Sequence, residues 1–180
     1  DTLGLTKEEV WTSSIVGVGG TIFMRFALGP ACDKYGPRIL MAVVLCAASI
    51  PTAMTGLVQT AGGLALLRLF IGTAGCTFVM CQFWATSMFT REVVGTANAL
   101  CGGWGNLGGG VTQLVMGAGL FPLFKIFFDG DAEKAWRTVS VVPAVDAFGS
   151  GVMIYFISDD KPKGNYSELK KHGNMANVSA

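Results

Sequence analysis

The stretch CGGWGNLGGGVTQ, residues 101–113, decides between two folds. It contains Gly103-x-Gly105-x-x-Gly108, the spacing of a dinucleotide-binding loop, and Asp129 follows about 20 residues later, where a ribose-binding carboxylate would stand. Such a loop connects a β-strand to a helix, but the preceding residues GTANAL do not have the pattern of a strand. The run also lies inside an apolar segment of about 25 residues, so we interpret it as part of a membrane helix.

The composition of the whole chain supports a membrane protein. Of its 180 residues, 51% are hydrophobic and 14% are charged, and the mean hydropathy is +0.52. Soluble domains carry about 25% charged residues. Here the charges gather in short clusters, and only Arg25, Arg68 and Asp146 interrupt the apolar stretches between them. These stretches are long enough to cross a bilayer as helices, at residues 11–32, 39–60, 64–88, 94–121 and 138–157. The sequence therefore predicts an all-α integral membrane protein with about five transmembrane helices.

Several other classes of protein are excluded. The first apolar stretch follows Glu8 and Glu9 rather than basic residues, and four more such stretches come after it, so it is not a signal peptide. The five cysteines form no C-x-x-C pair and the single histidine, His172, lies in the polar tail. We therefore expect no metal site, no cofactor and no enzymatic constellation. A net charge of +1 without a basic patch argues against a nucleic-acid partner and leaves the lipid bilayer as the surrounding medium.

Positive charges predict how the chain lies in the membrane. Cytoplasmic flanks of membrane helices carry an excess of lysine and arginine. One set of flanks holds four such residues, namely Lys7, Lys125, Lys134 and Arg137. The other set holds Lys34, Arg38, Arg91, Lys161, Lys163, Lys170 and Lys171, and we expect it to be cytoplasmic. Residues 1–10 would then form an outer loop and residues 158–180 a flexible cytoplasmic segment, in which the glycosylation-type triplets at Asn165 and Asn177 stay unused.

The glycine run has a second property, a polar face. Gly102, Asn106, Gly109 and Gln113 share one side of a helix, and Gly105-x-x-x-Gly109 is a pattern that lets two membrane helices approach closely. An amide within hydrocarbon needs a partner or water. Two interpretations remain open for Asn106: a hydrogen bond to a neighbouring helix, or a neutral donor aimed at a small anion near the middle of the membrane.

Arg25 lies near the middle of the first apolar stretch. Its charge must face the protein interior or a water-filled cavity, because a charged group facing lipid is costly. Two interpretations are again open. Arg25 could form a buried ion pair with Asp146, or it could remain unpaired and bind an anion, since a planar guanidinium matches a flat oxyanion through two parallel hydrogen bonds.

The residues just after Arg25 resemble a known loop. The sequence Gly29-x-x-x-Asp33-Lys34-x-Gly36-Pro37-Arg38 is similar to the loop between the second and third helices of the major facilitator superfamily, G-x-x-x-D-R/K-x-G-R-R/K, and departs from it at Pro37. RLFIGTAG, residues 68–75, resembles the R-x-x-x-G motif of the fourth helix. For Arg68 itself, a structural role or a position that lets the side chain reach the outer membrane surface is as plausible as a functional role.

The glycine run itself resembles the fifth-helix signature of nitrate/nitrite porters within that superfamily, G-W-G-N-L/M-G. TFVMCQFWATSMF, residues 77–89, is similar to their fourth helix. KAWRTVSVVPAV and SDDKPKGNYSELKK, residues 134–145 and 158–171, resemble the sixth helix and central loop of the fungal members. The resemblance covers essentially the whole chain.

This resemblance implies a fold, a function and a set of sites. Residues 11–157 would be helices two to six of an N-terminal half of six helices, and residues 158–180 the start of the central loop. The function would be secondary active uptake of nitrate, and possibly of nitrite, across the plasma membrane by alternating access, coupled to protons. Arg25 and Asn106 would bind the anion. The signature residues would let helices pack and slide: Gly103, Trp104, Gly105, Gly108, Gly109, Gly110 and Gln113. The gating loop would comprise Gly29, Asp33, Lys34, Gly36 and Arg38.

The chain also departs from that family. It shows five apolar stretches where a half has six and a full transporter twelve, so we expect it to be a fragment whose partner is the missing remainder of the same transporter. A substrate-binding arginine from the second half is absent. Two alternatives therefore stay open: a superfamily porter for another small anion or solute, and a membrane scaffold without transport.

Overall fold

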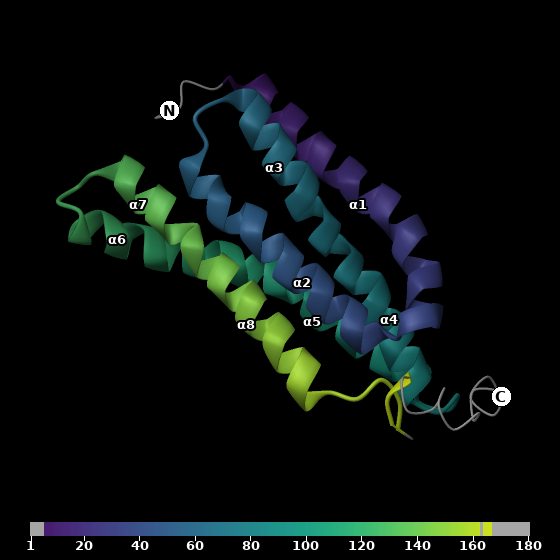
Figure 1. The fold of residues 1–180 in the computed structure, drawn as a ribbon. Helices are drawn as coiled ribbons and strands as arrows, with labels where there is room; N and C mark the ends of the chain where they lie inside the picture. Colours follow the sequence, from purple (N-terminus) through teal and green to yellow (C-terminus); the bar gives the residue numbers. More distant parts are fainter. Residues whose placement is uncertain (1–5, 163, 167–180) are drawn as a thin grey trace.

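The computed structural model describes residues 6–162 and 164–166 (Figure 1), and its regular structure is helical. Its helices follow one another along the chain in this order: α1 (Lys7–Tyr35), α2 (Pro37–Met54), η1 (Thr55–Leu57), α3 (Ala61–Thr73), η2 (Ala74–Cys76), α4 (Thr77–Met88), α5 (Val94–Gln113), η3 (Leu114–Leu120), α6 (Phe121–Phe127), α7 (Ala132–Val139) and α8 (Val141–Ile157). The short η1 and η2 are 3₁₀ turns, and η3 is a π-helix.

The five predicted membrane spans are confirmed. Helices long and apolar enough to cross a bilayer run over Lys7–Tyr35, Pro37–Leu57, Ala61–Met88, Val94–Phe127 and Ala132–Ile157. Each begins before the predicted stretch or at the same residue, because polar residues at the membrane surface extend the helices beyond their apolar parts. Successive spans run in opposite directions, so that the start of α1 and the end of α8 lie at opposite ends of the bundle (Figure 1).

The start of α1 shows how such polar residues extend a span. Thr6 caps the helix: its hydroxyl accepts from the Glu9 backbone N–H, and the Glu9 carboxylate accepts from the Thr6 backbone N–H at 2.8 Å. Glu8 and Glu9 also place negative charge in the first turn, where the helix dipole favours it. The acidic pair that argued against a signal peptide is thus part of a helix start.

Close packing of backbones joins α1 to α3. A Cβ at Gly20 would lie 2.5 Å from the Leu69 carbonyl oxygen, and one at Gly72 would overlap the Gly17 carbonyl. The hydroxyl of Thr21 crosses the same seam and donates to the Gly72 carbonyl oxygen at 2.5 Å. Small residues are what permit such an approach between membrane helices. The most intimate glycine packing in the described chain therefore lies here and not in the glycine run of α5.

Arg68 of α3 has a structural role in this seam. Its Nη1 donates to the Val10 carbonyl oxygen at 3.1 Å, to the Ser13 hydroxyl at 2.8 Å and to the Ser14 hydroxyl at 2.6 Å. These oxygens belong to the first turns of α1. Of the roles left open for Arg68 by its sequence, the structure thus supports the structural one, as a cross-link between two spans.

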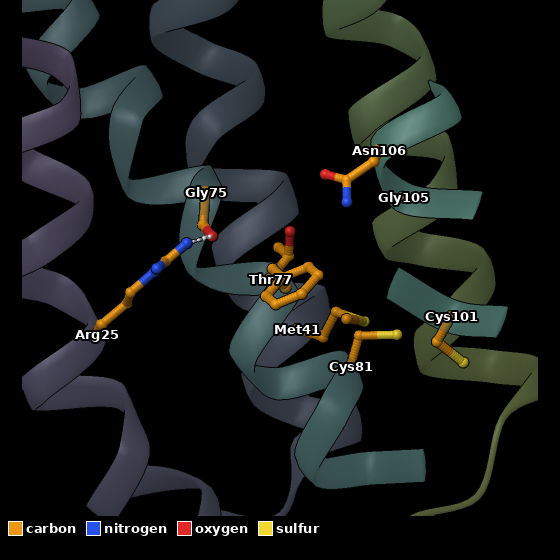
Figure 2. A pocket seen from close by; sticks show the side chains of 9 residues that line it. Arg25, Met41, Gly75, Thr77, Cys81, Cys101, Gly105 and Asn106 are labelled. Carbon is orange, nitrogen blue, oxygen red and sulfur yellow. Dashed lines mark hydrogen bonds between the residues drawn. The ribbon is translucent and has the colours of Figure 1, made fainter. Parts of the chain in front are cut away.

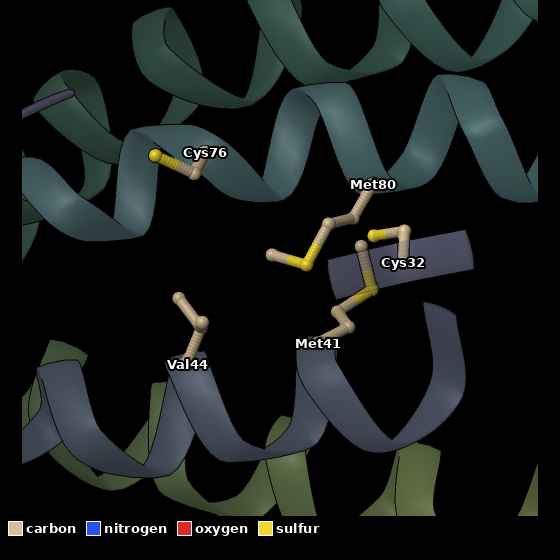
Figure 3. Close-up of a cluster of buried hydrophobic side chains, with 5 residues drawn as sticks. All are labelled: Cys32, Met41, Val44, Cys76 and Met80. Carbon is tan, nitrogen blue, oxygen red and sulfur yellow. The ribbon is translucent and has the colours of Figure 1, made fainter. Parts of the chain in front are cut away.

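The core is small and rich in sulfur (Figure 3). Cys32, Met41, Val44, Cys76 and Met80 form a buried cluster where α1, α2, η2 and α4 meet. Cysteine and methionine pack here as hydrophobic side chains, as expected for cysteines outside any disulfide or metal motif. The cluster fixes the ends of α1 and α2 relative to α4.

The fourth span is the most open part of the molecule. Its first helix, α5, packs on α4, and the span then widens into the π-helix η3 before α6. Pro122 follows η3 and has no N–H to donate to the preceding turn, which is a common cause of irregular helix geometry. A methyl group added at Gly103, Gly108, Gly109 or Gly110 would meet no described atom within 4 Å. The predicted packing at these glycines therefore has no counterpart within residues 6–162, and it stays a prediction for a neighbour outside them.

Candidate functional site

A cavity of about 500 Å³ lies between α1, α2, η2, α4 and α5 (Figure 2). It brings together Arg25 of α1 with Gly105 and Asn106 of α5, residues that the sequence had singled out separately. The other residues that line it are Met41, Gly75, Thr77, Phe78, Cys81 and Cys101. The predicted anion-binding arginine and amide thus face one shared space.

Arg25 reaches this cavity with most of its hydrogen-bonding capacity unused. Its Nη2 donates to the Gly75 carbonyl oxygen at 3.5 Å, a long contact, and no carboxylate of the described residues forms an ion pair with it. Gly75 lies in the 3₁₀ turn η2, where a Cβ would come within 2.8 Å of the Thr21 methyl group. The glycine therefore lets α1 come close enough for Arg25 to reach into the cavity.

Asp146 does not neutralise Arg25. It is exposed on α8, and it forms no ion pair within the part of the chain that the structure covers. α8 packs chiefly against α2 and does not bring its carboxylate to α1. The interpretation of Arg25 as half of a buried ion pair with Asp146 is therefore wrong, and the unpaired arginine remains.

Asn106 presents its amide to the cavity (Figure 2). Within residues 6–162 its side chain has no hydrogen bond to a neighbouring helix, so the first of its two interpretations has no support there. Two other amides do link α4 and α5: Gln82 donates to the Asn98 carbonyl oxygen at 3.2 Å, and Asn98 donates to the Thr86 hydroxyl at 3.1 Å. A structural amide and a cavity-facing amide thus lie two turns apart on α5.

The remaining lining is apolar, apart from Thr77. The Thr77 hydroxyl donates to the Ala74 carbonyl oxygen at 2.7 Å, so it offers the cavity only lone pairs. Phe78, Met41 and the two thiols of Cys81 and Cys101 supply a soft, weakly polar wall. One cation and one amide on such a wall give an environment that suits a small anion, because few but well-placed polar groups set the specificity of a binding site.

Sequence reasoning missed the contribution of α4 and η2 to the cavity. Thr77, Phe78 and Cys81 share one face of α4 at helical spacing, which is a visible signal, but an apolar span offers many such faces. The position of Gly75 depends on the 3₁₀ break of the third span, which no proline or charge marks. The other signature residues contribute less: Trp104 is 70% exposed and Gln113 is exposed.

The predicted gating loop is much shorter than expected. Asp33 and Lys34 belong to the last turn of α1 and α2 begins at Pro37, so only Gly36, with φ of 88°, stands between two helices. Gly29 is also helical, within α1. The predicted loop at 33–38 is therefore corrected to a one-residue junction, which glycine permits because it tolerates positive φ.

The described part of the predicted flexible tail is ordered against this junction. Asp160 is fully buried, and its carboxylate accepts from the Arg38 backbone N–H at 2.9 Å and from the Tyr166 backbone N–H at 3.2 Å. Burial, with the Asp33 and Asp160 carboxylates adding to it, raises the pKa of Tyr166. The expectation of a flexible segment is thus wrong for residues 158–162 and 164–166, and residues 167–180 lie outside the described residues.

The chain is similar in sequence to several proteins that are named as nitrate transporters. The chain is 38% identical over 175 residues to High-affinity nitrate transporter 2.3 of Oryza sativa subsp. japonica, which covers 97% of this chain and 34% of that protein. It is 35% identical over 176 residues to High affinity nitrate transporter 2.5 of Arabidopsis thaliana, covering 96% and 34%. With Nitrate/nitrite transporter NrtP of Nostoc punctiforme it shares 30% identity over 177 residues, covering 96% and 34%.

The chain therefore spans about a third of the length of the curated relatives that it matches. No solved structure matches it significantly. The model of the Major Facilitator Superfamily matches residues 1–177, nearly the whole sequence. Together with five membrane-spanning helices, this match shows that the chain belongs to the Major Facilitator Superfamily.

Proposed function

We propose that this chain is part of a nitrate porter of the fungal type, which takes up nitrate, and possibly nitrite, across the plasma membrane. In this proposal the five spans are helices two to six of the N-terminal half. The observation that carries the proposal is the cavity in which Arg25, without a carboxylate partner among the described residues, faces Asn106. The relatives named as nitrate transporters support the choice of anion.

The chemistry of the cavity explains how it would hold nitrate. The anion leaves water when it enters, and a positive charge must compensate for the lost hydration. The Arg25 guanidinium supplies that charge and two parallel N–H donors for a planar oxyanion. The Asn106 amide adds a neutral donor from the opposite helix, so that closing α1 and α5 around the anion tightens both contacts.

Uptake into a cell that is negative inside requires an energy source. Moving one negative charge inward against the membrane potential costs about 2.3 kcal/mol per 100 mV. We propose coupling to protons, which would remove this electrical cost, and alternating access, in which the two halves of the full transporter rock around a site near the middle of the membrane. Both parts rest on the family resemblance and not on a titratable group in this cavity.

The test is Arg25 replacement in the full-length protein that contains this chain. We expect Arg25→Ala to reach the membrane and to lose uptake of labelled nitrate, and Arg25→Lys to raise KM about ten- to hundredfold. This range corresponds to about 1.5–3 kcal/mol for a hydrogen bond to a charged group. Arg68→Lys is the matched control, because it changes another intramembrane arginine outside the cavity and should lower the amount of folded protein without changing KM.

Two results would contradict this function. Normal nitrate uptake by Arg25→Ala would remove Arg25 from the site. Arg25-dependent uptake of another solute, with no uptake of nitrate or nitrite, would instead favour a superfamily porter of different specificity.

A further inference from the structure

The residues that follow α8 turn back onto the α1–α2 junction. We call residues 158–162 and 164–166 the C-terminal segment. The segment contains Asp160, which has a relative exposure of 0% although its side chain carries a carboxylate. A buried charge persists only where hydrogen bonds or opposite charges compensate for lost hydration, so its surroundings indicate what the segment does.

Asp160 caps α2 from a distant part of the chain. The first N–H groups of a helix lack partners within the helix, and a carboxylate there also interacts favourably with the helix dipole. Gly36 occupies the capping position of α2 but has no side chain to fill it. The Asp160 carboxylate takes that place, accepting from the Arg38 N–H across 122 positions in the sequence.

Gly36 is shaped for this contact. A Cβ at Gly36 would lie 2.7 Å from the Asp160 carboxylate oxygen, and φ of 88° is a conformation that other residues rarely adopt. The glycine of the gating sequence is therefore required twice, for the sharp junction and for the space that Asp160 fills. Any side chain at this position would displace the carboxylate.

The Arg38 side chain completes the contact. Its Nη1 donates to the Ser158 carbonyl oxygen at 3.1 Å and to the Asn165 side-chain oxygen at 2.9 Å, and its guanidinium lies 5.3 Å from the centre of the Tyr155 ring. The Asp160 N–H donates to the same Asn165 oxygen at 3.3 Å. Both ends of the segment are thus tied to one arginine of the gating sequence.

A third contact ties the segment to another span. The Trp84 indole Nε1 of α4 donates to the Asp159 carbonyl oxygen at 3.0 Å. The C-terminal segment therefore bridges α2 and α4. These two helices also meet in the sulfur-rich core, which contains Met41 of α2 and Met80 of α4.

We propose that Asp160 is a positioning residue for transport, which locks the gating junction between α1 and α2 to the C-terminal segment. Its role rests on the proposed transport function, but the lock itself does not. With this lock in place, α2, α4 and the C-terminal segment move as one unit. A displacement of the two helices therefore also displaces the C-terminal segment. Asp160 does not touch the cavity and contributes to turnover through the position of α2.

Cys32 is a native reporter of this lock. It is 1% exposed, its carbonyl oxygen accepts from the Gly36 N–H at 3.0 Å, and its side chain belongs to the core cluster with Met41 of α2 and Met80 of α4. Loss of the Asp160 contacts would loosen α2 against α1 and α4, and we expect this to expose Cys32 to solvent. Alkylation of Cys32 by a membrane-impermeant maleimide, followed by mass spectrometry of its peptide, therefore measures whether the junction is closed.

The experiment compares Asp160→Ala with Asp159→Ala in inside-out vesicles that carry the full-length protein. Both changes remove one carboxylate, but Asp159 is exposed and its carboxylate has no contact among the described residues. We expect Cys32 to be alkylated at least about tenfold faster in Asp160→Ala, because loss of a buried charged hydrogen-bond acceptor costs more than the about 1.4 kcal/mol that a tenfold change requires. We expect wild-type protection in Asp159→Ala.

A double-mutant cycle that combines Asp160→Ala with Gly36→Ala tests the contact between Asp160 and the start of α2. Gly36→Ala should expose Cys32 as Asp160→Ala does, and the double variant should be no worse than either single one, since all three remove the same contact. In nitrate uptake, Asp160→Ala should lower the maximal rate and leave KM unchanged, which simple loss of folded protein would not do once uptake is scaled to the protein present.

The outcomes separate the lock from the proposed function. If Asp160→Ala does not reach the membrane, Asp160→Asn, which keeps one acceptor oxygen, replaces it and should give intermediate protection. The lock would be overturned if Cys32 stayed protected from alkylation in both Asp160→Ala and Asp160→Asn. It would also be overturned if Asp159→Ala exposed Cys32 as much as Asp160→Ala does. A protein that carries no nitrate would overturn the proposed function while leaving the labelling result intact.

Discussion

Two arginines within apolar spans show how surroundings decide the role of one residue type. Arg68 donates to three oxygens in the first turns of α1, so its charge is compensated within the chain. Arg25 has one long contact to a carbonyl oxygen and opens onto a cavity. A charge is costly inside a membrane unless compensated, so the second arginine is the one prepared for an anion.

Asn106 provides the second residue-scale prediction. Asn106→Ala removes a donor from the cavity, and we expect KM for nitrate to rise about tenfold or more, since a hydrogen bond to a charged partner contributes about 1.5–3 kcal/mol. The amount of protein in the membrane should stay near that of the wild type. Concentration-dependent uptake of labelled nitrate measures both KM and the maximal rate.

Asn98→Ala is the contrasting variant on the same helix. Asn98 links α5 to Thr86 and does not line the cavity, so its loss should reduce stability while KM stays constant. If Asn106→Ala behaves like Asn98→Ala, Asn106 is a packing amide in the full protein and not part of the site.

The sequence predicts individual residues only where a physical rule limits their surroundings. Arg25 and Asn106 could be selected because polar groups in a membrane need compensation, and the structure places both at one cavity. The same rule could not say which partner each residue finds, so the sequence left an Arg25–Asp146 pair and an unpaired Arg25 both open, and only the structure decides against the pair. Asp160 looked like one charge in a polar tail, because a contact across 122 positions leaves no local pattern.

At the scale of helices, the seam between α1 and α3 is the part most sensitive to side-chain size. Gly72→Ala would place a methyl group against the Gly17 carbonyl and should force the two helices apart. We expect a loss of about 1–3 kcal/mol in stability, the usual cost of overpacking. The temperature at which half of the full-length protein aggregates in detergent, read by size-exclusion chromatography after heating, would fall.

Gly62→Ala is the matched control on the same helix. No described atom lies within 4 Å of a methyl group at that position, and alanine favours helix formation over glycine. The control should therefore keep or slightly raise the melting temperature. Equal losses from both variants would show that the α1–α3 seam is looser than the structure describes.

Hydropathy predicted the five spans well because a membrane helix needs a long apolar segment whatever it packs against. It could not predict the internal breaks. The 3₁₀ turn η2 and the π-helix η3 lie within uninterrupted apolar sequence, and their positions depend on contacts between helices. Small residues likewise permit close packing without specifying it: Gly72 meets α1, whereas Gly108 and Gly109 meet no described neighbour.

At the scale of the whole molecule, much of the apolar surface faces outward. Large side chains such as Phe23, Phe26 and Phe156 are exposed along the spans, as expected for helices in contact with lipid. The open glycine face of α5 differs, because small residues gain little from contact with lipid and allow another helix to approach. Since the relatives are about three times as long as this chain, the face is available to further helices of a longer protein.

The orientation of the whole bundle gives the last prediction. The turn between α6 and α7 and the C-terminal segment are separated by one span, so they lie on opposite sides of the membrane. Asp129 and Asp159 are both exposed, one at each of these places, and therefore form a matched pair for cysteine labelling. The lysine and arginine excess predicts that Asp159 lies in the cytoplasm. In intact cells an impermeant polyethylene glycol maleimide should shift the mobility of the Asp129→Cys protein, whereas the Asp159→Cys protein should react only after permeabilisation. The parent protein corrects for native cysteines. Labelling of Asp159→Cys in intact cells would invert the topology, and the gating junction with its Asp160 cap would then face the outside of the cell.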